Sequence, residues 1–122
     1  MLRGGLIAES LRVGAVLSGV DLTVRRVSRA DVGDVDAGQP LTWTFIEFEA
    51  AAGDADRLAE ALSAVLETRG HWYCDFRTDD ETFVVFSGRV FRYRRGDARG
   101  RAKAADYARS VGVPEPQVDW PE

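Results

Sequence analysis

The sequence is poor in the residue types that hold small proteins together covalently or through metal ions. Its 122 residues include one cysteine, Cys74, and one histidine, His71. A disulfide needs two cysteines, and a structural zinc site needs about four cysteine or histidine ligands. We therefore expect no disulfide within the chain and no structural metal. The scarcity of cysteine favours a reducing compartment, which we take to be the cytoplasm.

Long hydrophobic runs are also missing. The first ten residues lack the apolar run of about 7–15 residues that a signal peptide contains. No stretch approaches the roughly 18 apolar residues of a membrane span. The net charge of −4 and the isoelectric point near 5.0 make nucleic acid an improbable partner. These absences predict a cytoplasmic protein without a membrane partner.

What the chain does contain is typical of a folded domain. Hydrophobic residues make up 45%, charged residues 30% and aromatic residues 10% of the sequence, a mixture that disordered chains do not have. A length of 122 residues falls within the commonest size range for one domain. We expect residues 1–122 to form a single domain.

Hydrophobic periodicity predicts both strands and helices. Leucine and valine recur at helical spacing between Asp54, a candidate N-cap, and Gly70. A second helix follows Gly96 and Asp97, and we expect Trp120 to fold back onto the domain. Strands are predicted at residues 20–27, 41–50, 71–78, 82–86 and 89–93, with an acidic loop at 29–40. This order predicts an α+β fold, a two-layer arrangement of a mostly antiparallel sheet with both helices on one face.

Two tight turns, at residues 79–80 and 87–88, determine which side chains share a face of the last three strands. One face receives Trp72, Cys74, Phe76, Phe83, Val85 and Val90. The other receives Tyr73, Asp75, Arg77, Val84, Phe86, Phe91 and Tyr93. Because this second face is also largely apolar, it must be covered. We expect it to pack against the N-terminal strands or a second copy of the chain, and the alternative is a ligand cavity.

Carboxylates supply the first candidate chemistry. Glu47 and Glu49 lie two apart on one predicted strand, as do Asp75 and Arg77 on another. Crowded carboxylates raise one another's pKa and serve as acids, bases or cation ligands. The alternative is an exposed strand end where Arg77 pairs with an acid. Cys74 faces away from His71, Tyr73 and Asp75, which argues against a thiol nucleophile.

A basic segment at residues 89–109 is the second candidate. It holds eight basic residues and two acidic ones. Arg92, Arg94, Arg95 and Arg99 are candidates to bind a phosphate or carboxylate, and Tyr73 and Tyr93 to stack on a ring. The alternative is a solvated face, because arginine is abundant throughout and Asp97 occupies the helix N-terminus. No phosphate-loop or dinucleotide motif is present, and no cofactor is expected.

The C-terminal half carries a distinctive series of short motifs. They are HWYCDF at 71–76, ETFVVF at 81–86, RVFRY at 89–93, SVGVP at 110–114 and DWP at 119–121. This series resembles that of small uncharacterised proteins from high-GC Gram-positive (actinobacterial) bacteria. The resemblance implies a bacterial source and brings no catalytic residue.

Two functional hypotheses follow from the sequence. The first is a non-catalytic binding or protein-interaction module that forms a homodimer through its sheet face. The second is a binding protein or enzyme for a small anionic ligand. There Glu47, Glu49 or Asp75 would act as acid or base, and the basic segment would hold the anionic group.

Overall fold

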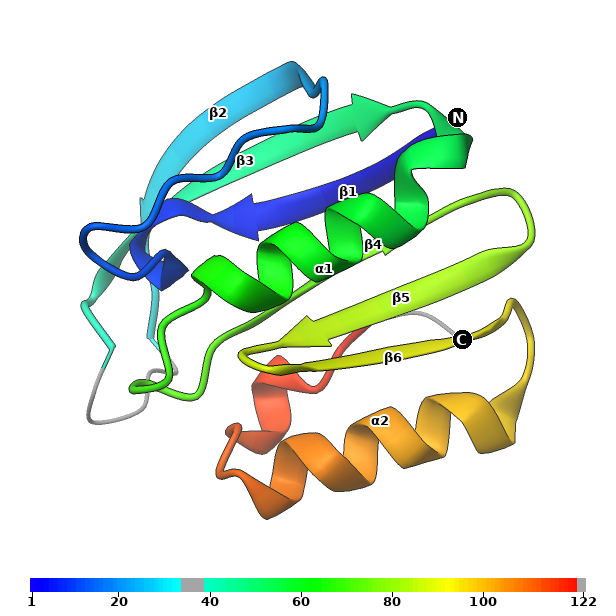
Figure 1. Cartoon of the computed structure of the whole chain (residues 1–122). Coiled ribbons are helices and arrows are strands. Elements are labelled where there is room, and N and C mark those ends of the chain that lie inside the picture. Colours follow the sequence, from blue (N-terminus) through cyan, green and yellow to red (C-terminus); the bar gives the residue numbers. More distant parts are fainter. Residues whose placement is uncertain (34–38, 121–122) are drawn as a thin grey trace.

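The computed structural model describes residues 1–33 and 39–120. One six-stranded sheet runs through it in the order β2-β3-β1-β4-β5-β6, and every neighbouring pair is antiparallel (Figure 1). The strands are β1 (Leu2–Ile7), β2 (Thr23–Asp31), β3 (Thr42–Ala50), β4 (Tyr73–Arg77), β5 (Glu81–Phe86) and β6 (Arg89–Arg94). The helices are α1 (Ala55–Val65) and α2 (Ala98–Ser110). Short 3₁₀ turns occupy Ala8–Ser10, Ala52–Asp54 and Glu115–Gln117.

The first strand lies in the middle of the sheet, between β3 and β4. Leu2 and Leu6 lie on the same face of β1, because side chains of a strand alternate between its faces with a period of two. Both are buried. Between them lie Gly4 and Gly5, which present no side chain to either face. Because β1 separates β3 from β4, the carboxylates of those two strands are not on adjacent strands.

Helix α1 covers one face of the sheet. Leu58 and Leu62 are fully buried and belong to a core cluster with Phe48, Phe76 and Phe83 from three different strands. The predicted leucine stripe is therefore confirmed. Asp54 stands at the N-cap position but its side chain makes no capping hydrogen bond, unlike the expectation.

Helix α2 covers the opposite face. Its three buried alanines, at positions 104, 105 and 108, pack in a second cluster with Val84 and Phe86 of β5. Gly100 lets the helix approach β6, because a Cβ there would lie 2.8 Å from Cγ of Tyr93. Asp97 caps the helix as predicted, accepting hydrogen bonds from the backbone N–H groups of Arg99 and Gly100.

The α+β fold with an antiparallel sheet is confirmed, but the two helices lie on opposite faces rather than on one. In Figure 1, α1 lies in front of the sheet and α2 lies below β6. The cause lies in β5, whose Phe83 and Val85 face α1 whereas Val84 and Phe86 face α2. A strand that is apolar on both faces is buried on both.

The two turns are confirmed, since Arg77 pairs with Thr82 and Phe86 pairs with Arg89. Trp120 folds back as expected and is only 2% exposed. The strand predicted at 20–27 begins and ends later, and part of the predicted acidic loop, 34–38, lies outside the described residues. Within the described residues, the helices are too short and too polar to cross a bilayer.

Candidate functional site

A groove crosses the α2-side face of the sheet above Gly5. The strand register places Glu47 of β3 on one side of Gly5 and Asp75 of β4 on the other. Gly5 forms the floor of the groove, and this floor is open in the sense that no side chain fills the space above it. A Cβ at Gly5 would have one neighbour within 4 Å, the Ile46 carbonyl oxygen at 3.9 Å. The cavity measures about 580 Å³. It is lined by Gly5, Leu6, Ile7, Asp31, Val32, Gly33, Trp43, Phe45, Ile46, Glu47, Trp72, Tyr73, Cys74, Asp75, Pro116, Gln117 and Asp119.

Aromatic side chains of β3 form one wall of the groove. The Trp43 ring lies 6.1 Å from the ring of Phe45 and 5.1 Å from that of Trp72, measured between centroids. Its indole N–H donates a 2.8 Å hydrogen bond to the Pro40 carbonyl oxygen. This hydrogen bond satisfies the one polar atom of the side chain and holds the largely buried ring in the wall of the groove.

Tyr73 and the chain after α2 form the opposite wall. The Tyr73 hydroxyl donates a hydrogen bond to the Gln117 carbonyl and lies 2.8 Å from Oδ1 of Asp119. The Tyr73 ring also meets the Trp120 ring edge-on at 5.0 Å. Burial, followed by the neighbouring Asp119 carboxylate, raises the pKa of Tyr73 well above its ordinary value. The phenol therefore stays neutral and holds the C-terminal segment against β4.

Asp75 is the most perturbed carboxyl group of the groove. Burial, and then the negative charge of Asp119, raise its pKa to about 6, while the positive charge of Arg77 opposes the rise. No described residue gives the Asp75 side chain a hydrogen bond or an ion pair within 4 Å. Ionising a partly buried carboxyl group that receives no hydrogen bond is costly. A ligand that donates a hydrogen bond to Asp75 would therefore be favoured.

The predicted carboxylate cluster is only partly assembled. Glu47 borders the groove, where Arg26 lies 3.6 Å from its carboxylate. Glu49 lies outside it and pairs with Arg25 at 3.1 Å and with Arg3 at 3.5 Å. The sequence raised the possibility of an ion pair between Arg77 and an acid. Within the described part of the chain Arg77 forms none, although its charge is felt by Asp75.

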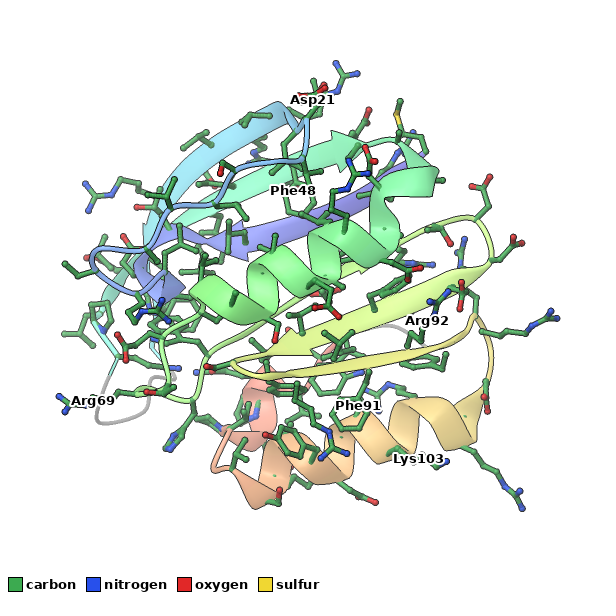
Figure 2. All side chains as sticks on the ribbon, in the orientation of Figure 1. Asp21, Phe48, Arg69, Phe91, Arg92 and Lys103 are labelled. Atoms are coloured by element: carbon green, nitrogen blue, oxygen red, sulfur yellow. The ribbon has the colours of Figure 1, made fainter. Side chains whose placement is uncertain are left out.

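The structure does not bring the basic segment together with the groove. Arg92 lies on the α1 side of the sheet (Figure 2). There it pairs with Glu81 and Asp56, each at 2.6 Å. Arg95 donates a 3.3 Å hydrogen bond to the Asp79 carbonyl. Arg94 and Arg99 are exposed at the junction of β6 and α2. Tyr93 is 5% exposed in the second core, so its ring has little surface left for a ligand; of the predicted binding residues, only Tyr73 lines the groove.

Sequence reasoning missed the residues that shape this site. Gly5 forms its floor, and two carboxylates come from elements distant in the sequence: Asp31 ends β2, and Asp119 lies in the segment after α2. The available signal was the pair Gly4–Gly5 between two apolar residues, Leu2 and Leu6. Glycine inside a strand marks a place where a ligand or another backbone approaches closely.

Comparisons with protein-family models, curated proteins and solved structures found no match to this chain. The structure itself defines an α+β protein with one antiparallel sheet and an aromatic groove on one sheet face. That groove is the feature of the fold that suggests a function.

The perturbed carboxyl group predicts a pH-dependent gain in stability for Asp75→Asn. An unfolded aspartate ionises near pH 4, whereas folded Asp75 has a pKa of about 6. Between these two pKa values the folded state therefore binds more protons than the unfolded state. As a result, the unfolding free energy of the wild type falls as the pH rises from about 4 to about 6. Near pH 7.5 we expect Asp75→Asn to be more stable than wild type by on the order of 2 kcal/mol. Near pH 4 the difference in unfolding free energy between Asp75→Asn and wild type should be smaller, because Asp75 is then protonated in the folded state.

Urea unfolding at both pH values measures this difference. Asp21→Asn removes the same charge from an exposed position and controls for net charge. Equal destabilisation of Asp75→Asn at both pH values would instead identify Asp75 as a structural partner of Arg77.

Proposed function

We propose that this protein binds a small organic molecule in the groove above Gly5. The observation that carries the proposal is a cavity of about 580 Å³ with an open floor at Gly5 and aromatic side chains in its walls. Ligand pockets in proteins measure roughly 300–1,000 Å³ and combine apolar walls with a few polar groups. The groove has this composition, with Trp43, Phe45 and Tyr73 as walls and Asp75 among its polar groups.

Binding without catalysis is the form of the proposal that the residues favour. The Cys74 thiol points away from the groove into the α1-side core, where burial raises its pKa far above the ordinary value. Glu47 and Asp75 flank Gly5 from strands that lie two steps apart, which places their backbones roughly 10 Å from each other. Among the described lining residues, the hydroxyl that contacts a carboxylate is that of Tyr73, beside Asp119. Burial and the Asp119 charge raise the pKa of this phenol well above its ordinary value, which disfavours the phenolate that a nucleophile would require.

Self-association through the sheet face receives less support. That hypothesis depended on an uncovered apolar surface, and α2 with the residues after it now covers Val84 and Phe86. Figure 2 shows Phe91 pointing from β6 toward α2 in the same layer. A homodimer, and a partner for the basic segment, remain predictions from the sequence.

A Gly5→Val variant tests the groove directly. We expect it to abolish ligand binding, because the branched side chain fills the open floor, and to change the unfolding free energy by less than about 1 kcal/mol, because valine suits a strand. The measurement is a thermal-shift screen of metabolites against both proteins. A ligand at 100 times its dissociation constant adds about 2.7 kcal/mol, or several degrees.

Thr23→Val is the control, since it places the same branched apolar side chain at an exposed position on β2 and exchanges only a hydroxyl for a methyl group. It should retain every ligand of the wild type. A ligand that binds Gly5→Val and wild type equally well does not use the groove. Such a result, or a screen in which nothing shifts wild type, would contradict the proposal.

A further inference from the structure

The charges of the groove are all of one sign. Its described lining residues include four carboxylates, Asp31, Glu47, Asp75 and Asp119, and no lysine, arginine or histidine. A groove of this kind repels anions and attracts cations. A cationic ligand would be opposite in sign to the anionic ligand of the second hypothesis from the sequence.

Three of these carboxylates already have partners. Asp31 accepts a 2.8 Å hydrogen bond from the Thr42 hydroxyl, Glu47 pairs with Arg26, and Asp119 contacts the Tyr73 hydroxyl. Asp75 has none among the described residues, and it lies beside the open floor at Gly5. Asp75 is therefore the group that a ligand would satisfy.

The arrangement suits an organic cation better than a metal ion. In the described part of the chain, no three carboxylate, histidine or cysteine side chains converge as metal ligands, whereas a divalent ion needs several oxygens at 2–2.6 Å. The carboxylates are instead spread along the cavity between aromatic rings. Such walls accept the apolar body of a ligand and attract a positive charge through their π faces.

Resting on the proposed function, we infer that the ligand is an organic cation, in which a primary ammonium or guanidinium group is attached to an apolar body. The cationic group donates hydrogen bonds to the Asp75 carboxylate, and the body lies over Gly5 between Phe45 and Tyr73. Asp75 requires N–H donors as well as positive charge, so a quaternary ammonium ion would bind less well than a primary one.

Three probes of one shape separate charge from body. They are 2-phenylethylamine, the neutral 2-phenylethanol and the anionic 3-phenylpropanoate, each titrated against the full chain at millimolar concentration and followed by tryptophan fluorescence and by calorimetry. We expect the amine to bind at least tenfold more tightly than the alcohol and the carboxylate not to bind. Asp75→Asn should weaken the affinity for the amine at least tenfold and leave the affinity for the alcohol unchanged. Asp21→Asn should change neither affinity.

The outcomes distinguish this inference from the proposal beneath it. If the alcohol or the carboxylate binds as well as the amine, and Gly5→Val abolishes that binding, the groove binds ligands but the cationic class is wrong. The cationic class is also wrong if Asp75→Asn leaves the amine affinity unchanged. If no probe binds and the metabolite screen is also blank, the groove proposal fails with it.

Discussion

Gly4→Ala is expected to lose about 3 kcal/mol or more of unfolding free energy, the upper end of what overpacking costs. Gly4 lies in β1, opposite Phe76 of β4. An alanine Cβ there would collide with Cβ of Phe76 and would lie 2.6 Å from the Asp75 carbonyl oxygen and 2.9 Å from Cα of Phe76. These are backbone or near-backbone atoms in the centre of the sheet, so they yield only if β1 and β4 move apart.

Gly5→Ala is the matched control for this prediction. It adds the same methyl group to the next residue of the same strand, where only the Ile46 carbonyl oxygen lies within reach, at 3.9 Å. We expect it to be neutral or to gain up to about 1 kcal/mol, because alanine restricts the unfolded chain more than glycine does. Urea unfolding of the two variants measures the difference. Equal stability would show that β1 does not pair with β4 as described.

The sequence predicts the last three strands of the sheet but not β1, the strand that contains the adjacent glycines. Apolar strand patterns bounded by tight turns were sufficient for β4, β5 and β6, because those strands pair locally and each turn sets the next register. The position of β1 was not predictable in this way. A short segment with two glycines carries a weak strand pattern, and its partners, β3 and β4, are separated from it by about 40 and 70 residues.

The helix positions were missed for a related reason. Each helix showed its own apolar stripe, but a stripe does not indicate which face of a sheet it covers. That information was in β5, where the run from Phe83 to Phe86 is apolar at every position. A continuous apolar run indicates a strand covered on both faces, so helices on opposite faces could have been inferred from these four residues.

Some residues of the candidate site could be predicted from the sequence, but the full set of residues that border the groove could not. Glu47, Asp75 and Tyr73 were identified from the strand pattern and do border the groove. The gap between them depends on β1, and the second wall depends on Gln117 and Asp119, which come after α2 and lie in no strand. The arginines of residues 89–109 stand out in the sequence by their number, yet none of them borders the groove. Arg92 and Arg109 pair with acids, and Arg101 contacts Trp120.

Trp120→Ala is expected to lose about 3–5 kcal/mol of unfolding free energy, the usual cost of removing a buried tryptophan. The ring is 2% exposed and lies 5.0 Å from the Tyr73 ring and 6.5 Å from the Phe86 ring. Arg101 stacks its guanidinium 5.6 Å above it and donates a 3.1 Å hydrogen bond to the Trp120 carbonyl. One side chain therefore attaches the C-terminal segment to both β4 and α2.

Loss of that attachment should weaken ligand binding as well as stability. Gln117 and Asp119 border the groove and lie immediately before Trp120, so an undocked segment would remove one wall of the cavity. Urea unfolding and ligand titration at low temperature, where the variant is folded, measure the two effects separately. Val111→Ala removes a partly exposed apolar side chain from the residue that follows α2 and should change neither by much. If Trp120→Ala lowers stability but retains full affinity, β3 and β4 alone form the binding surface, and the C-terminal segment serves only the second core.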